Sequence, residues 1–205
     1  MKFIIPSLLL LVLVGCKDSE TKTNTTRQIP AVENATQKTT QNQKNLEAIG
    51  LEYAHTTQQA LGKQLVGTIQ KKGTLAALKF CNIQAYPITD SMALKHNAII
   101  KRVSDKPRNQ ANKANAAELE YIKSFKQDIV NGITPIPLVK ENRDDTVEFY
   151  YPIITNAMCL QCHGTEKEVN PETLAVIRSL YPKDMALGYG TNEVRGIWSI
   201  NFKEQ

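Results

Sequence analysis

The residues best suited to chemistry in this chain lie together in the segment Cys159-Leu160-Gln161-Cys162-His163. Two cysteines separated by two residues can each add a thiol to one vinyl group of a haem, and the histidine directly after the second cysteine is then an axial ligand of the iron. The motif therefore predicts one covalently attached c-type haem. Cys159 and Cys162 are the expected thioether residues, and His163 is an expected iron ligand.

Two other interpretations of this motif are a chance or thioredoxin-like Cys-x-x-Cys pair that happens to precede a histidine, and a zinc site. A zinc site requires two further ligands at short spacing. The remaining candidates, Cys81, His55 and His96, are all distant from the motif in the sequence. The sequence therefore favours the haem.

The N-terminus resembles a bacterial lipoprotein signal. An apolar run over residues 3–14 is too short to span a bilayer but suits the core of a signal peptide. The segment Leu13-Val14-Gly15-Cys16 resembles a lipobox, which predicts removal of residues 1–15 and lipidation of Cys16; an ordinary secretory signal with a coincidental cysteine is the alternative. We expect an exported protein, anchored by lipid on the periplasmic side of a membrane. Lys17 after the cysteine favours the outer membrane if the cell is Gram-negative.

The composition is that of a globular protein. A hydrophobic content of 41% in 205 residues suffices for one domain with a core built around a cofactor. The basic residues are scattered and form no stripe with interleaved aromatic residues, so nucleic-acid binding is not expected. Residues 16–45 are rich in Thr, Asn, Gln and charged side chains, which predicts a flexible tether. The haem domain is expected to cover residues 46–205.

Helices are expected to open this domain and to position Cys81. Apolar residues recur at helical spacing from residue 46 until Gly73, where the helix should stop. A second helix is expected from about residue 74 to 85, ended by Pro87. Ala77, Leu78, Cys81 and Ala85 would share one face of it, against which a porphyrin can lie. Ordinary core packing is the alternative for Cys81.

The rest of the chain predicts a small sheet with helices inserted. Alternating or β-rich segments indicate strands over residues 98–103, 138–140, 146–153 and 197–202, the last with one apolar face. Asn115 and Glu118 form a capping-box pattern for a helix whose inward residues would be Leu119, Ile122, Phe125 and Ile129. A further helix should begin near residue 170. The expected fold class is α+β with a mostly antiparallel sheet.

Several motifs, taken in order, complete the pattern: Lys79-Phe80-Cys81, Arg108-Asn109, Tyr151-Pro152-Ile153, the Cys-x-x-Cys-His-Gly motif, Tyr181-Pro182-x-Asp184-x-Ala186-x-Gly188-Tyr189, and Arg195-Gly196. Together they resemble a bacterial single-haem c-type family catalogued as a domain of unknown function. The family's usual Pro after Arg-Asn is Gln110 here. The resemblance implies a PAS-like sheet, found alone or ahead of signalling kinases. It also implies an iron held by His163 and by the thiolate of Cys81.

These features lead us to expect a redox or small-ligand sensor that passes its signal to a separate redox or signalling protein. A single-haem electron carrier is the alternative. Its second iron ligand would be the sulfur of Met92 or Met185, or a ring nitrogen of His96. Met158 is excluded because it is too close to Cys159 to reach across the haem. An enzyme such as a peroxidase is not expected, because a His/Cys iron has no open position.

Overall fold

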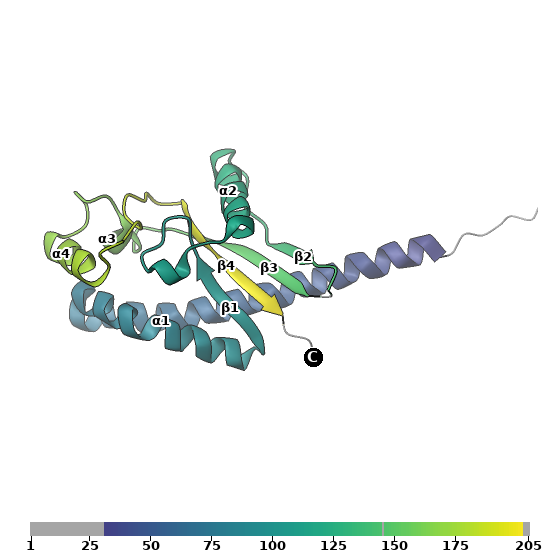
Figure 1. Ribbon diagram of the computed structural model, residues 1–205, viewed down its shortest axis with the longest axis horizontal. Coiled ribbons are helices and arrows are strands. Elements are labelled where there is room, and N and C mark those ends of the chain that lie inside the picture. The colour runs from purple at the N-terminus through teal and green to yellow at the C-terminus, as the bar shows by residue number, and fades with distance from the viewer. Residues whose placement is uncertain (1–30, 145, 203–205) are drawn as a thin grey trace, which may run out of the picture.

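The computed structural model describes residues 31–144 and 146–202, with side chains from residue 41 onward. Its first element, α1 (Ala31–Lys95), consists of two helical arms that meet at Gly73, whose φ of 79° and ψ of 172° are non-helical. Glycine adopts a positive φ at little cost, which confirms Gly73 as the end of the first helix. The second arm (residues 74–95) runs back beneath the sheet alongside the C-terminal part of the first arm (residues 31–72), whose N-terminal part extends beyond the sheet (Figure 1).

Two features of α1 correct the sequence prediction. The first arm begins at Ala31, so residues 31–45 of the expected tether are helical, while the expected signal peptide and the expected lipidation site Cys16 lie outside the described residues. The second arm continues through Pro87 to Lys95, although proline lacks the N–H of a helical hydrogen bond. Tertiary packing outweighs this loss, because Thr89 is buried and Ala93 packs against the apolar cluster around Trp198.

The sheet contains four strands: β1 (Ala98–Val103), β2 (Leu138–Glu141), β3 (Val147–Ile154) and β4 (Val194–Phe202). Their order is β1-β4-β3-β2, and every pairing is antiparallel, which agrees with the mostly antiparallel sheet that the sequence predicts. The apolar face expected on the last strand is present, with Trp198, Ile200 and Phe202 in one cluster, but the opposite face is buried as well. β4 lies inside the sheet, so both Ile197 and Trp198 are buried although they point to opposite faces.

Helices cover both faces of this sheet. The arms of α1 pack on one face around Phe149 and Trp198, and Gly50 permits the close approach because a Cβ there would overlap the Phe149 ring. On the other face, α2 (Ala116–Val130) packs Ile122 and Phe125 against Tyr150. The predicted α+β, PAS-like class with long N-terminal helices is confirmed.

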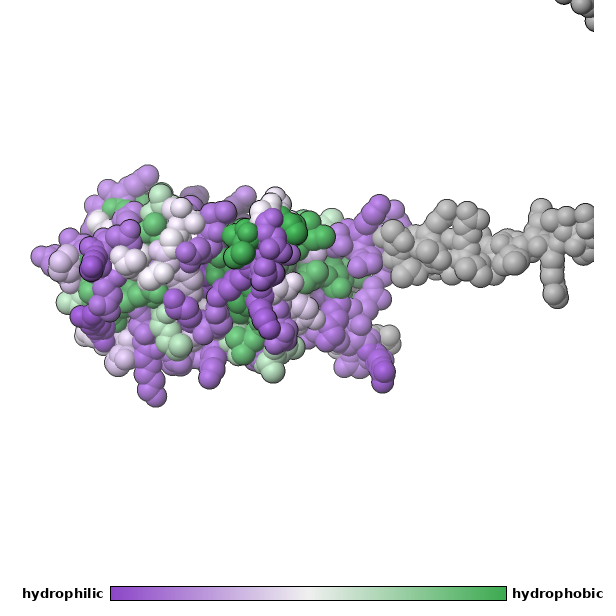
Figure 2. Space-filling view, turned by 90° about the horizontal axis from the view of Figure 1, so that it is seen from above, coloured by the Kyte–Doolittle hydropathy of each residue, from purple (hydrophilic) through white to green (hydrophobic). Residues whose placement is uncertain are grey.

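The capping box of Asn115 and Glu118 is present as predicted at the start of α2. Ile122 and Phe125 are buried as expected, but Leu119 is 38% exposed, so its assignment as an inward residue was wrong. Apolar side chains also gather among hydrophilic ones on the face of the molecule that α2 occupies (Figure 2). Val130, Ile133 and Ile136 at the end of α2 and just beyond it are the exposed apolar residues there.

Short elements close the end of the molecule where the two arms meet. The turn η1 (Gln110–Asn112) follows β1, and α3 (Leu160–His163) follows β3. α4 (Pro171–Leu180) begins at Asn170 as predicted and buries Leu174 and Ile177 against Leu78 of the second arm. Within the described residues, no helix has an apolar stretch sufficient to cross a bilayer.

Candidate functional site

The Cys-x-x-Cys-His motif forms one helical turn at α3. The backbone N–H groups of Cys162 and His163 donate to the Cys159 carbonyl at 3.2 and 3.0 Å. Residues three and four positions apart lie on the same side of a helix, so this turn gathers both thiols and the imidazole on one side. Both cysteines are free thiols and half-buried. The local structure therefore presents the three side chains together, as covalent attachment requires.

His163 is oriented by a segment that follows α4. Its Nδ1 lies 2.7 Å from the Ala186 carbonyl oxygen. Because a carbonyl can only accept, the proton is on Nδ1 and the Nε2 lone pair is available to a metal. Two backbone hydrogen bonds hold the same segments together, from Gly188 to Gly164 and from Tyr189 to His163, each 2.9 Å. The ring of His163 is thus fixed in the tautomer whose Nε2 can accept a metal.

The electrostatic surroundings of His163 also favour the neutral ring. Burial, and then the positive charges of Arg195 and Arg108, lower the pKa of His163 well below its ordinary value. A neutral imidazole is the form that binds a metal. His163 therefore does not have to lose a proton at neutral pH before it acts as a ligand.

Arg108 connects the loop after β1 to the motif. Its guanidinium pairs with Asp184 at 3.1 Å and donates to the Cys162 carbonyl at 2.7 Å and the Ala186 carbonyl at 3.3 Å. The side chains of this ion pair are only 10% and 6% exposed. Gln110, which stands where the family has Pro, donates to the Lys183 carbonyl at 2.6 Å. The loop after β1 therefore supports both the motif and the segment that orients His163.

Cys81 lies on the inward side of the second arm, one turn beyond the buried residues Ala77 and Leu78. Burial raises the pKa of the Cys81 thiol, and the charges of Arg102, Arg195 and Arg108 oppose this. Burial also raises the pKa of Cys162, the charge of Arg108 lowers it, and Cys81 raises it further. The arm that carries Cys81 contacts the motif turn directly, because the Thr74 hydroxyl donates to Gln161 Oε1 at 2.8 Å. The structure thus brings Cys81, from a different element, to the group formed by Cys159, Cys162 and His163.

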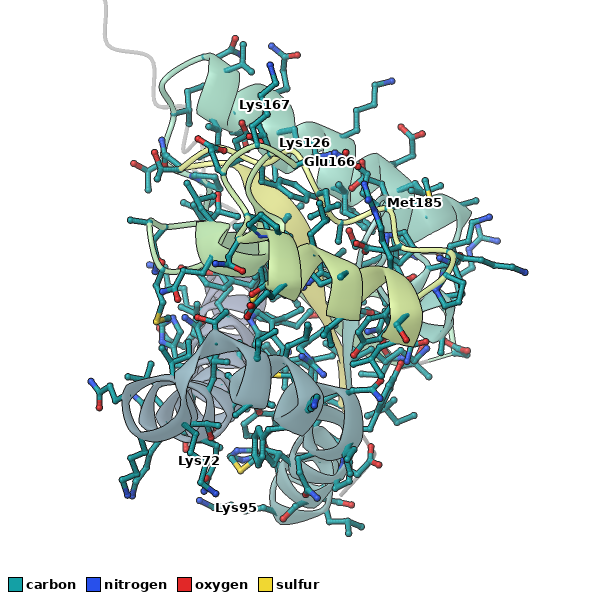
Figure 3. All side chains as sticks on the ribbon, turned by 90° about the vertical axis from the view of Figure 1, so that its left-hand side faces the viewer. Lys72, Lys95, Lys126, Glu166, Lys167 and Met185 are labelled. Atoms are coloured by element: carbon teal, nitrogen blue, oxygen red, sulfur yellow. The ribbon has the colours of Figure 1, made fainter. Side chains whose placement is uncertain are left out.

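The alternative ligands lie elsewhere. His96 Nε2 is 2.8 Å from the Thr56 hydroxyl and its ring stacks on Tyr53 at 4.2 Å, at the far end of the second arm. Met92 is eleven residues beyond Cys81 on the same arm, about 16 Å along a helix axis. Met185 is 50% exposed at the outside of the loop after α4 (Figure 3).

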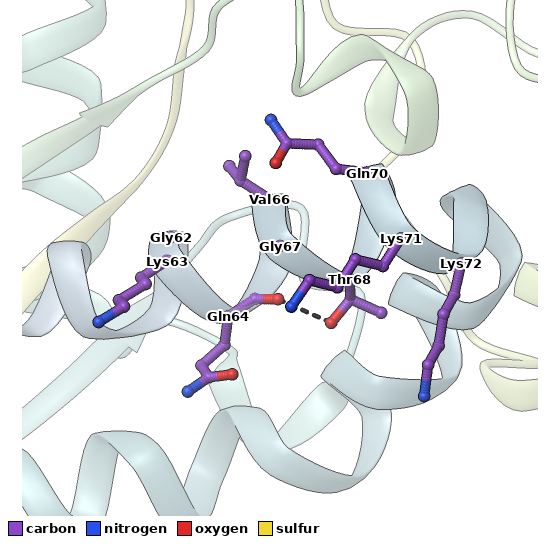
Figure 4. A pocket seen from close by; sticks show the side chains of 9 residues that line it. All are labelled: Gly62, Lys63, Gln64, Val66, Gly67, Thr68, Gln70, Lys71 and Lys72. Carbon is purple, nitrogen blue, oxygen red and sulfur yellow. Dashed lines mark hydrogen bonds between the residues drawn. The ribbon is translucent and has the colours of Figure 1, made fainter.

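The groove beside the first arm contains none of the predicted site residues. It is lined by residues 62–72, among them Lys63, Lys71 and Lys72, and Thr68 donates to the Gln64 carbonyl at 2.7 Å (Figure 4). No group of three or more His, Cys, Asp or Glu side chains suited to a metal ion occurs in the described part of the chain. The site is therefore defined by the motif and Cys81.

Sequence reasoning did not identify the arginines of this site. Arg102 was given no role, although alternation along β1 places it on the same inward face as Ala98 and Ile100. The partnership of Arg108 with Asp184 joins residues 76 positions apart, and no local pattern predicts such a pair. Arg195 was noted only as part of a family motif. The period-two pattern of β1 was the one available signal.

The comparisons with known proteins concern the whole domain. The model of the Tll0287-like family matches residues 20–202. Among solved structures, the chain is similar to the crystal structure of the cyanobacterial heme-protein Tll0287, at 20% identity and a TM-score of 0.55, over 76% of this chain and 95% of that chain. At this identity the likeness concerns the fold. No curated protein matches the chain. Because the family model spans most of its length, the chain belongs to the Tll0287-like family.

Proposed function

We propose that this protein carries one covalent c-type haem, with thioether bonds to Cys159 and Cys162 and with His163 and Cys81 as axial ligands. The observation that carries the proposal is the bond from His163 Nδ1 to the Ala186 carbonyl, which leaves Nε2 free beside two reduced cysteines. Such a haem supplies one-electron chemistry and, when a ligand leaves, a binding place for a small molecule. The heme named for the solved relative supports the same assignment.

The residues present fit this group. The thiols of Cys159 and Cys162 are free, and His163 is held neutral by burial and by two arginines. The Nε donors of Arg102 and Arg195 are buried and have no hydrogen-bond partner. Unpaired buried donors of this kind are expected where an anionic cofactor supplies the missing acceptors. With both axial positions taken, no iron position is open to a peroxidase reaction, so we propose no catalytic role.

We further propose that the haem senses redox state or a small ligand. Cys81 stands on a helical segment limited by Gly73 on one side and Pro87 on the other. Each of these residues interrupts helical hydrogen bonding, so the segment between them can shift as a unit. A sensor needs such an element with two positions. The partner that receives the signal would be a separate redox or signalling protein.

Electron transfer is the second candidate, and one contact favours it. Arg102 donates to the Ala85 carbonyl at 3.3 Å, which fastens the Cys81 segment to β1. A fixed ligand suits a carrier, because ligand rearrangement slows electron transfer. Binding of CO to the reduced protein separates the two functions: a sensor with a labile Cys81 bond binds CO readily, and a carrier with a fixed ligand does not.

We also propose export and anchoring through lipid on Cys16, on the periplasmic side of a membrane. The lipobox-like segment before Cys16 supports this placement. The part of the first arm that precedes its contact with the sheet at Gly50 would separate the haem domain from the membrane surface.

The central test is covalent attachment. Protein produced with a cytochrome c maturation system should keep its haem through acid-acetone extraction and on denaturing gels, with an absorption spectrum characteristic of haem in both redox states. Replacing both motif cysteines, Cys159→Ala with Cys162→Ala, should abolish the attached haem because no thioether can form. Extraction of the haem from the wild-type protein would contradict the proposal.

A further inference from the structure

Arg102 and Arg195 converge on the candidate site from neighbouring strands. Arg102 projects from β1 toward the second arm, where it reaches the Ala85 carbonyl. Arg195 stands at the start of β4, and its backbone carbonyl accepts a 2.6 Å hydrogen bond from the Ser104 hydroxyl just after β1. Burial raises the pKa of the Cys81 thiol and the charges of Arg102 and Arg195 oppose this, while the hydrogen bond to Ala85 places the Arg102 guanidinium one helical turn from Cys81.

Neither arginine has the partner that a buried guanidinium requires. The Nε atoms of Arg102 and Arg195 are buried without a hydrogen-bond acceptor. Arg108, the third arginine of the group, is paired with Asp184, but in the part of the chain that the structure describes, Arg102 and Arg195 form no ion pair. A buried cation normally has a counter-charge, because its desolvation is otherwise uncompensated.

Arg102 and Arg195 also stand at the same end of two paired strands, because β1 and β4 run antiparallel with Val103 opposite Ile197. Burial comes first, followed by the charges of Arg108 and Arg102, in lowering the pKa of Arg195 to about 10. Burial lowers the pKa of Arg102 as well. Like charges held together in a desolvated place indicate that an anion belongs between or beside them.

We propose that Arg102 and Arg195 hold the two propionate carboxylates of the haem. The stoichiometry agrees, since a haem carries two carboxylates and the site has two guanidiniums without a counter-ion. A guanidinium can bind a carboxylate with two parallel hydrogen bonds, one of them from Nε, which is the unmet donor on each residue. This inference rests on the haem assignment above and names the residues that fix the orientation of the group in its plane.

The test uses the mature holoprotein and variants Arg102→Gln and Arg195→Gln. The matched control is Arg178→Gln, because Arg178 pairs with Glu166 at the surface and is 60% exposed. Resonance Raman bands of the propionate groups should shift in both site variants and stay in place in the control. The midpoint potential should fall in both site variants, because a lost positive charge favours the ferric state.

The variants Arg102→Lys and Arg195→Lys keep the charge but lose the two-pronged hydrogen bond. They should shift the propionate bands while the midpoint potential stays near the wild-type value. If the Gln variants do not fold, the Lys variants alone test the inference. Covalent haem with unchanged propionate bands in the site variants would overturn the inference and leave the haem assignment standing. A changed thiolate spectrum without a propionate shift would also overturn it, assigning the arginines to Cys81. Absence of covalent haem from the wild-type protein would instead defeat the proposed function.

Discussion

Arg108 and Asp184 form a buried ion pair that connects the loop after β1 to the segment orienting His163. The pair is 3.1 Å long, and Arg108 also reaches the carbonyls of Cys162 and Ala186. The same guanidinium therefore touches the motif and the acceptor of the histidine ring. Removal of the Asp184 carboxylate should therefore lower the free energy of unfolding and also change the absorption spectrum of the haem.

Asp184→Ala leaves the Arg108 charge buried without a counter-ion. We expect the free energy of unfolding to fall by about 3–5 kcal/mol, the usual cost of breaking a buried pair from one side. Denaturant titration measures this change. Glu166→Ala is the control, because the Glu166–Arg178 pair is about 60% exposed on both sides and should contribute less than about 1 kcal/mol. Equal losses in the two variants would contradict the structural role of the buried pair.

Cys81→Ala should leave the haem covalently attached and change its absorption spectrum. The wild-type ferric protein is expected to be low-spin with thiolate-type bands, and the variant should lose these bands and gain an open position. Its midpoint potential should rise, because a thiolate favours the ferric state. Spectra identical to the wild type in both redox states would make Cys81 a core residue and would favour His/Met or His/His ligation.

Substitution of Gly50 should disturb the contact between the first arm and the sheet. Gly50→Ala places a methyl group into the Phe149 ring and should lower the free energy of unfolding by about 1–3 kcal/mol, as overpacking does. Gly62 is the matched control on the same arm, since a Cβ there meets no atom within 4 Å. Gly62→Ala should raise stability by about 0.5–1 kcal/mol through helix propensity. Thermal or denaturant unfolding of both variants checks the opposite signs.

Membrane attachment should depend on Cys16. A single acyl chain holds a protein only weakly, at about 0.8 kcal/mol for each buried CH₂, so stable anchoring needs the several chains of a lipoprotein. Cys16→Ser should release or misprocess the protein, as cell fractionation would show. Retention of that variant on membranes after a high-salt wash would require another anchor.

Local patterns sufficed for much of the fold. Gly73, the Asn115–Glu118 capping box and the alternation in the strand segments each impose a backbone choice that needs no distant partner. Pro87 shows where such reasoning fails, because packing of Thr89 and Ala93 on the sheet outweighs a missing helical hydrogen bond. The burial of both faces of β4 could not be predicted from its own residues either, because it depends on the strand order, which places β4 inside the sheet.

The candidate site divides in the same way. Cys159, Cys162 and His163 are adjacent in sequence, so their spacing alone predicts the chemistry. Cys81 was assigned through a family resemblance, and its approach to the motif depends on the packing of the second arm, which contacts the motif turn through Thr74 and Gln161. The Ala186 carbonyl that orients His163 is a backbone group, which no residue-type pattern can single out.

The central place of β4 has a consequence for biogenesis. β1 and β3 do not pair with each other; each pairs with β4, which is among the last described residues of the chain. On the proposed export route, residues 159–163 would emerge before the strand that joins the two halves of the sheet, and before the 186–189 segment that pairs with the motif. The two thiols of the motif would then be open to haem attachment before the sheet can close.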